Sequence, residues 1–436
     1  MSNVVPARMG AATWVRLWDA ARAHWSAPLH RSTYLMTANL LVTLVSGVGF
    51  WLLASRMLSP AQIGIASAFL APSNFLAIVF LLGANYGVLR FAREIEQDQH
   101  LLFSAIWLSA TASAIGSVVC AALILWSGVI RPIGGSSMLS IVLYALLVAS
   151  STIWTVCECG FVGLRAPWQM LVRNVGFGLV RIAILVPFAY LGEVGLVLSF
   201  AIGTCLAALL SVDLLRRHLH TPWTVLFTFW HARLKEMIGF ALPNHLVNLI
   251  SSAPGMMLPL IVMHVLGAEI NGFFSVAWTM ASILRSVLTA SSVTLLAEGS
   301  RDHSTISSQL GRTLGFLFGI VGAASLPMVL FPELVLLPFG AAYAHANSMT
   351  LRLFALSLLP AVLTTVFMAR ERVERRVRFI IALSVATCVL STTLPYYGAL
   401  GGGYTGFAFW YFVSQCVLGL AVVPALVRAI YRHGSH

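Results

Sequence analysis

The chain has 436 residues, of which 59% are hydrophobic and only 9% are charged, and its net charge is +12. A soluble domain usually carries about a quarter charged residues, so this composition excludes a soluble globular protein. Apolar runs of about 20 residues, each long enough to cross a hydrocarbon core of ~30 Å, recur along the whole chain. The sequence therefore predicts an all-α, polytopic membrane protein.

The first segment, residues 1–32, is expected to be a cytoplasmic amphipathic segment. Trp14, Trp18 and Trp25 recur at helical spacing in it, which favours a helix lying in the lipid headgroup region. No small-residue cleavage site follows a short apolar core, so a signal peptide is not expected. Aromatic residues at similar spacing predict a second interfacial helix in the linker at 216–236.

Twelve membrane spans are expected. Six precede the linker and form an N-terminal bundle over 33–215, and six follow it over 237–428, leaving a short tail at 429–436. The expected spans are 33–55, 64–89, 101–127, 138–160, 172–191, 195–215, 237–262, 271–296, 311–332, 348–369, 378–397 and 404–427.

The basic residues predict the orientation. Most of the 26 lysines and arginines fall in the tails and in alternate loops, all on one side of the membrane in this arrangement of spans. The positive-inside rule then places both termini in the cytoplasm. The excess positive charge is expected to face anionic lipid headgroups, so nucleic acid is not an expected partner.

Two stretches, at 55–69 and 263–277, share a sequence pattern. Each follows an apolar run and contains a leucine, then a small residue, then a short polar break that ends in glycine. With a shift of 208 residues, Leu58 aligns with Leu266 and Gly64 aligns with Gly272. An even number of spans in each repeat gives two halves of equal orientation. The pattern thus predicts two six-helix bundles related by a parallel pseudo-two-fold axis along the membrane normal.

Four stretches carry a resemblance to a known family: SRMLSPAQIG, IGFALPNHLVNLISS, VLGAEINGFFSVAWTM and LLPFGAAYAHA. They resemble the bacterial polysaccharide-biosynthesis (O-antigen/oligosaccharide) flippases. These belong to the multidrug/oligosaccharidyl-lipid/polysaccharide exporter superfamily, together with multidrug and toxin extrusion (MATE) proteins. One departure is Ser59-Pro60-Ala61-Gln62, where the family more often has Gly and an acidic residue.

The resemblance implies a transporter of the bacterial plasma membrane and not an enzyme. Its members move a polyprenyl-(pyro)phosphate-linked oligosaccharide from the inner to the outer leaflet by alternating access. The implied partners are this lipid-linked glycan, membrane lipids and polysaccharide assembly proteins. No cofactor is expected. Whether a proton gradient or a sodium gradient supplies the energy for transport is left open.

Such a substrate needs a hydrated cavity with fixed positive charge and groups that replace water around sugars. Arg285 is the main candidate, because polar residues accompany it at helical spacing and an intramembrane arginine is costly. A structural arginine bonded to a neighbouring helix is the alternative. The expected substrate-binding residues are Arg285, Arg181, Ser282, Thr289, Asn248, His245, Asn39 and Asn174.

Two further residues carry open alternatives. Glu158 is expected either to pair with an arginine or to couple transport to an ion, unless it is an exposed carboxylate at the membrane boundary. His245 is a candidate proton-linked switch, with a hydrogen-bonded helix contact as the alternative. Cys157 and Cys159 flank Glu158 without a second pair nearby, so we expect no metal site and no disulfide framework.

Two other functions remain as alternatives. A MATE-type antiporter exports cations and is expected to line its cavity with acidic residues. A membrane-embedded glycosyltransferase or polymerase needs acidic catalytic residues, and the short outer loops carry only isolated carboxylates.

Overall fold

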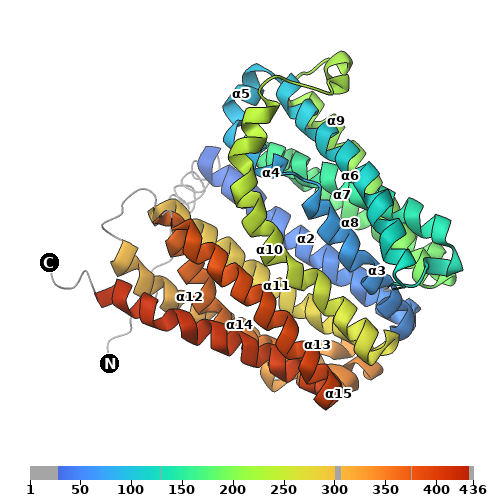
Figure 1. Ribbon diagram of the computed structural model, residues 1–436, viewed down its shortest axis with the longest axis vertical. Coiled ribbons are helices and arrows are strands. Elements are labelled where there is room, and N and C mark those ends of the chain that lie inside the picture. The colour runs from blue at the N-terminus through green and yellow to red at the C-terminus, as the bar shows by residue number, and fades with distance from the viewer. Residues whose placement is uncertain (1–27, 129, 300–305, 375, 432–436) are drawn as a thin grey trace, which may run out of the picture.

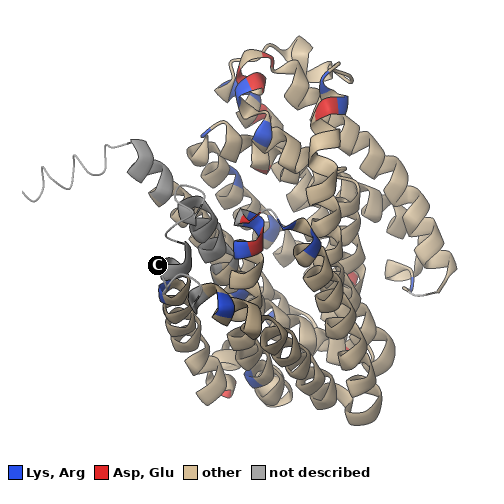
Figure 2. Cartoon of the chain, turned by 60° about the vertical axis from the view of Figure 1, so that its left-hand side comes forward, with Lys and Arg blue, Asp and Glu red and all other residues tan. Residues whose placement is uncertain are grey.

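The computed structural model describes residues 28–128, 130–299, 306–374 and 376–431, and the secondary structure of these ranges is helical. The interfacial helix expected around Trp14 to Trp25 lies outside the described residues. Ten helices of the described chain are long and apolar enough to cross a membrane. Charged residues gather mainly at helix ends (Figure 2).

We call helices α2 to α9 the first helix set; apart from α3, which packs most closely against α11 and α10, they pack mainly against one another. Short 3-10 turns η1 (Ile133–Gly135) and η2 (Ala189–Leu191) interrupt the set. Its helices are α2 (Pro28–Met57), α3 (Pro60–Val79), α4 (Ala84–Arg90), α5 (Ala92–Gln97), α6 (His100–Trp126), α7 (Ser137–Gly163), α8 (Pro167–Phe188) and α9 (Glu193–His218).

Helices α10 to α15 form the second helix set in the same sense. The 3-10 turn η5 (Leu337–Phe339) lies between two of them. The helices are α10 (Leu234–Leu266), α11 (Ala268–Gly299), α12 (Ile306–Leu330), α13 (Pro332–Leu336), α14 (Ala341–Val373) and α15 (Val377–Tyr431).

Helix α15 is 55 residues long but reverses direction at Gly403, whose backbone is at φ 60° and ψ −145°. Gln415 donates from Nε2 to Ser391 Oγ at 2.8 Å. In a straight helix these residues would lie about 36 Å apart at 1.5 Å per residue. The chain therefore folds back here, between the expected spans 378–397 and 404–427.

The expected span 64–89 differs from the structure, because it is divided into α3 and α4. Leu82 and Gly83 both have positive φ, at 50° and 81°. At Gly83 a Cβ would lie 2.9 Å from the Cβ of Ala241 on α10. The break thus lets α10 approach the backbone closely.

The stretch Ser59-Pro60-Ala61-Gln62 forms the start of α3, with Ser59 as the N-cap. Ser59 Oγ accepts from Gln62 N at 3.3 Å, and Gln62 Oε1 accepts from Ser59 N at 3.0 Å. This is a capping box, with Pro60 in the first helical turn. It satisfies amide donors at the helix start without an acidic residue.

The linker after α9 is not the expected interfacial helix. Only the 3-10 turn η3 (Trp223–Phe227) lies between α9 and α10. Pro222 lacks an amide hydrogen and disfavours helix at the residue before it. The side chains of Trp223, Phe227 and Trp230 are exposed all the same.

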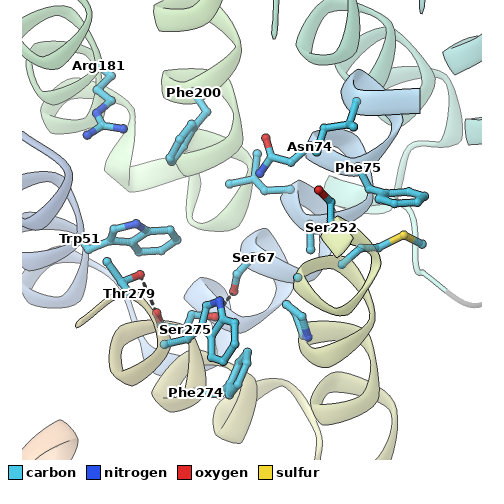
Figure 3. A pocket seen from close by; sticks show the side chains of 17 residues that line it. Trp51, Ser67, Asn74, Phe75, Arg181, Phe200, Ser252, Phe274, Ser275 and Thr279 are labelled. Carbon is cyan, nitrogen blue, oxygen red and sulfur yellow. Dashed lines mark hydrogen bonds between the residues drawn. The ribbon is translucent and has the colours of Figure 1, made fainter. Parts of the chain in front are cut away.

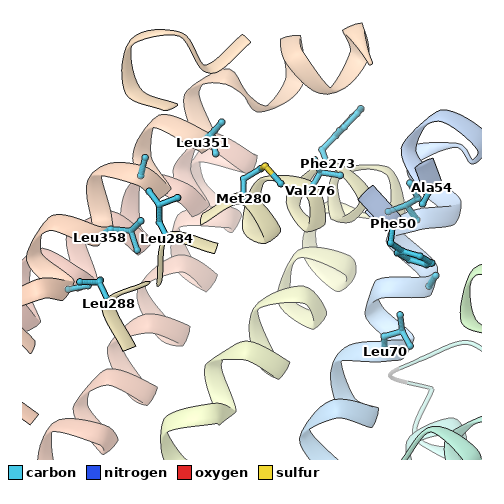
Figure 4. Packing of buried hydrophobic residues seen from close by; sticks show 14 of the residues in the cluster. Phe50, Ala54, Leu70, Phe273, Val276, Met280, Leu284, Leu288, Leu351 and Leu358 are labelled. Carbon is cyan, nitrogen blue, oxygen red and sulfur yellow. The ribbon is translucent and has the colours of Figure 1, made fainter. Parts of the chain in front are cut away.

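The two helix sets meet along α3, which packs against both α10 and α11 (Figure 1). One apolar core crosses this boundary. It joins Phe50 and Leu70 of the first set with Phe273 and Met280 of the second (Figure 4). We call the end with the α2–α3 and α10–α11 junctions the turn end, and the end with residues 219–233 the linker end.

Candidate functional site

A cavity of about 450 Å³ lies between the two helix sets. Its walls come from α2, α3, α8 and α9 of the first set and from α10 and α11 of the second. This volume falls in the range of typical small-molecule sites, roughly 300–1,000 Å³. Figure 3 shows Arg181 and Phe200 on one side of the cavity and Ser275 and Thr279 on another.

Arg181 on α8 is the one lysine or arginine among the described residues that line this cavity. The residue is only 6% exposed. Its guanidinium carbon lies 4.9 Å from the ring centroid of Phe50, 4.7 Å from that of Phe177 and 5.5 Å from that of Phe200. These rings attract the cation through their faces.

The rings give Arg181 no hydrogen-bond acceptor. Its buried Nε has no hydrogen-bond partner in the described chain. A buried charge without a hydrogen-bonded partner is costly. Small neighbours make room for the side chain: a Cβ on Gly47 would lie 3.8 Å from its Nη2. The arrangement holds a cation in place with donors left to serve an anion.

The opposite wall supplies hydroxyl groups and aromatic rings. Ser275 Oγ donates to Ser67 Oγ at 2.7 Å, and Thr279 Oγ1 donates to the Ser275 carbonyl at 2.8 Å. Trp51 and Trp278 add large aromatic surfaces. No Asp or Glu is among the described lining residues. The lining thus combines one cation with neutral polar groups.

Arg285, the main candidate from the sequence, is not among the residues that line the cavity. Its Nη2 donates to Tyr411 Oη at 2.7 Å, and its guanidinium carbon lies 5.8 Å from the Trp278 ring centroid. Both contacts lie within the second helix set. Helical spacing alone does not distinguish a residue facing the cavity from one facing the next helix.

Ser282, one turn before Arg285, is not among the described residues that line the cavity either. Ser282 Oγ donates to the Trp278 carbonyl of its own helix at 2.7 Å. The side chain of Thr289 lies outside the described residues. Arg285 and Ser282 therefore make their contacts within the second helix set.

Asn174 and Asn39 bond to each other instead of facing the cavity. Asn174 Nδ2 donates to Asn39 Oδ1 at 2.6 Å and to Thr43 Oγ1 at 3.3 Å. Asn174 Oδ1 accepts from Arg173 Nε at 2.8 Å. The bonds join α2 to α8, the helix that carries Arg181.

Glu158 extends this network to α7. Its Oε2 accepts from Arg173 Nη2 at 2.9 Å and from Trp154 Nε1 at 2.8 Å. The Arg173 side chain is completely buried, whereas that of Glu158 is 38% exposed. Of the alternatives for Glu158, the structure shows pairing with an arginine, and that arginine is Arg173.

His245 and Asn248 lie on α10 towards the linker end. His245 is buried, its Nε2 donates to the Val79 carbonyl of α3 at 3.3 Å, and its Nδ1 has no hydrogen-bond partner among the described residues. Asn248 is half-buried and does not line the cavity. The His245 contact joins the two helix sets.

Several cavity residues, including Trp51, Asn74 and Phe200, are not among the residues expected from the sequence. One signal was available. The shift of 208 that aligns Gly64 with Gly272 also aligns Ser67 with Ser275, and both serines line the cavity. Extending the repeat along α3 and α11 would have pointed to these two serines.

Comparison with known proteins identifies the fold. The chain is similar to an inward-facing multidrug resistance MATE family transporter of the MOP superfamily, with a TM-score of 0.68 and 15% identity over 92% of this chain and 99% of that one. It is similar to lipid II flippase MurJ in an inward closed conformation, with a TM-score of 0.68 and 14% identity over 92% and 90%. A MATE structure in the straight conformation gives a TM-score of 0.65 and 16% identity over 94% and 97%.

No family model matches the sequence, and no curated protein matches it. The chain thus has an all-helical, multi-pass membrane fold like those of the MATE family transporter and of MurJ. At these identities the likeness establishes the fold alone. The substrate has to be argued from the cavity.

Proposed function

We propose that the protein is a flippase that moves a sugar linked to polyprenyl phosphate or pyrophosphate from the inner to the outer leaflet. Twelve spans form two six-helix bundles, 33–215 and 237–428, which rock about the central cavity. Both termini lie in the cytoplasm of a bacterial cell, so that the turn end faces outwards. The lipid-linked glycan and the surrounding lipids are the partners.

The reciprocal contacts of α3 and α11 support the two-fold relation between the bundles. A Cβ on Gly64 would lie 1.8 Å from the Ala268 carbonyl oxygen, and one on Gly272 would lie 1.9 Å from the Pro60 carbonyl oxygen. The shift of 208 converts the first pair into the second. Such a symmetric contact is expected where two parallel repeats meet on their axis.

The observation that carries the proposal is the charge of the cavity. The Nε of Arg181 is buried in its wall without a hydrogen-bond partner among the described residues, and no described lining residue is acidic. A phosphate oxygen provides the missing acceptor, since guanidinium and phosphate form paired, charge-assisted hydrogen bonds. The neutral hydroxyl and amide groups then replace water around a sugar.

A second candidate is a MATE-type antiporter for organic cations. The aromatic surfaces of Trp51, Phe274 and Trp278 favour it, because such rings attract cations. Arg181 opposes it, because a cation in the same cavity would be repelled without a carboxylate to balance the charge. The flippase is therefore the better explanation of this lining.

The test is a leaflet-exchange assay in proteoliposomes. The purified protein is reconstituted with a mixture of polyprenyl-phosphoryl and polyprenyl-pyrophosphoryl hexose, and the sugar exposed outside is measured with a membrane-impermeant oxidant. Exchange above that of empty liposomes, lost in Arg181→Gln and partly kept in Arg181→Lys, is expected. Exchange of neither lipid, together with export of a cationic dye, would establish the antiporter instead.

The other residues selected from the sequence have supporting roles in this proposal. The bonds among Asn39, Asn174 and Arg173 hold α8 against α2, and so hold Arg181 at the cavity. Glu158 neutralises Arg173, and we assign it ion pairing. Arg285 braces α11 against α15 through Tyr411.

A further inference from the structure

We propose that the headgroup carried through the cavity contains a single phosphoryl group, as in a polyprenyl-phosphoryl sugar, and not a pyrophosphate. This inference rests on the proposed function and narrows its substrate class. A phosphodiester carries one negative charge, whereas the diester of pyrophosphate carries two. The cavity wall, in the part of the chain that is described, offers one guanidinium.

Two other arginines within the helices, Arg173 and Arg285, are not among the described residues that line the cavity. Arg173 is paired with Glu158 at 2.9 Å, and its side chain is completely buried. Arg285 donates to Tyr411 at 2.7 Å and is not part of the lining. A second phosphoryl charge would therefore have no cation beside it among the described lining residues, and a charge taken out of bulk water without a partner is disfavoured.

The surroundings of Arg181 also limit how many phosphoryl groups it can hold. The ring centroids of Phe50, Phe177 and Phe200 lie within 5.5 Å of the guanidinium carbon. These rings present only carbon atoms to the guanidinium group. What remains for a ligand is the N–H donors at the edge of the guanidinium. A bidentate pair of hydrogen bonds to two oxygens of one phosphate uses such an edge.

The rest of the lining suits a sugar attached directly to that phosphate. Asn74 of α3 is exposed and lines the cavity, and Ser252 of α10 lines it as well (Figure 3). The hydroxyl of Thr279 lies on the wall of α11. These neutral groups accept and donate hydrogen bonds to hydroxyl groups, but they do not balance a second anionic charge.

The test compares two lipids that differ only in the linkage: a polyprenyl-phosphoryl hexose and the polyprenyl-pyrophosphoryl form of the same hexose. Each is reconstituted separately with the protein, and the initial rates of leaflet exchange are measured. We expect the monophosphate lipid to exchange about tenfold faster or more, because the difference in binding sets the selectivity. Equal rates, or a faster pyrophosphate lipid, would overturn this inference and leave the flippase proposal intact.

A gain-of-charge variant tests the mechanism of the preference. Asn74→Arg adds a second cation to the cavity, and we expect the ratio of the two rates to fall to about one or below. Asn74→Gln is the matched control and is expected to keep the wild-type ratio. Ser252→Arg adds the charge from the other helix set, should Asn74→Arg fail to elute as a folded protein. An unchanged ratio in a folded variant of either kind would contradict the charge-matching argument, and exchange of neither lipid by the wild type would instead refute the proposed function.

Discussion

Ser275 donates a hydrogen bond to Ser67 at 2.7 Å, and the two serines are 208 residues apart. That separation is the shift that aligns the two repeated stretches of the sequence, so each serine is the counterpart of the other. Two equivalent residues can touch only where the pseudo-two-fold axis passes between them. The contact lies on the cavity wall and joins α3 to α11.

The close approach of α3 and α11 gives the first prediction. In Gly64→Ala, the new Cβ would lie 1.8 Å from the Ala268 carbonyl oxygen and 2.8 Å from the Gly272 amide nitrogen. Both neighbours are backbone atoms, so the helices must separate, at a cost of about 1–3 kcal/mol or more. We expect a lower Tm in detergent and a loss of leaflet exchange.

The control for this variant is Gly315→Ala on α12, where no atom lies within 4 Å of the added Cβ. It is expected to be neutral or slightly stabilising, because alanine favours helix over glycine. A Gly64→Ala protein with the wild-type Tm and exchange rate would contradict the tight contact.

The ion pair of Glu158 and Arg173 gives the second prediction. Glu158→Gln leaves Arg173 charged and completely buried. Removing one partner of a fully buried pair costs about 3–5 kcal/mol; we expect about 1–3 kcal/mol here, because Glu158 is partly exposed. The double variant Glu158→Gln/Arg173→Met removes both charges and is expected to recover part of the lost stability.

Thermal unfolding and exchange measured on the same samples separate stability from ion coupling. If Glu158 only neutralises Arg173, the double variant regains exchange as it regains stability. A stable double variant without exchange would show that Glu158 or Arg173 acts in transport beyond its effect on stability.

Arg56 gives the third prediction, which concerns the turn end. Its Nε donates to the Pro338 carbonyl at 2.7 Å and its Nη2 to the Leu337 carbonyl at 3.2 Å, so the end of α2 is tied to η5 of the second helix set. Arg56→Ala removes this connection. We expect a cysteine placed at Thr279 to react severalfold faster with an impermeant thiol reagent applied at the turn end, since opening there becomes less costly.

Arg131→Ala serves as the control, because Arg131 is an exposed arginine without a hydrogen-bond or ion-pair partner among the described residues. In both variants the six native cysteines are first replaced, so that the reagent labels only the cysteine placed at Thr279. Equal labelling rates in Arg56→Ala and Arg131→Ala would exclude a role of Arg56 in closing the turn end.

The fourth prediction concerns pH and the linker. His231 Nε2 donates to Asp98 Oδ2 at 3.0 Å, and the His100 amide donates to Asp98 Oδ1 at 3.1 Å. Burial alone would raise the pKa of Asp98, but these hydrogen bonds and the attraction to both rings hold it below its ordinary value. The Asp98 carboxylate helps to hold His231, and with it the linker, against the start of α6. This contribution to stability is present above the ordinary carboxyl pKa and is lost as pH falls through the lowered pKa.

The carboxylate of Asp98 is 49% exposed, so the pair contributes less than about 1 kcal/mol. We expect the hydrogen-exchange protection of residues 228–234 to fall modestly between pH 5 and pH 3, and to be lower and less pH-dependent in Asp98→Asn. Glu96→Gln, an exposed neighbour on α5, is the control. The same pH profile in Asp98→Asn as in the wild type would rule out this linkage.

The sequence predicted an all-helical, multi-pass membrane fold because this fold class depends on residue type along one dimension. Long apolar runs have one stable arrangement in lipid, the helix, in which the backbone is satisfied locally. The glycines of the repeat, Gly64 and Gly272, lie where α3 and α11 cross, since two backbones can approach so closely only where side chains are missing.

Only the tertiary structure decided which polar residues share a space. Arg285 has the stronger signal in the sequence, yet Arg181 lines the cavity and Arg285 bonds to Tyr411. The same holds for Asn174, which bonds to Asn39, 135 residues away. The reason is that the rotation of a helix about its axis depends on the neighbours it packs against, and a 3.6-residue period specifies a face of the helix without naming what that face meets.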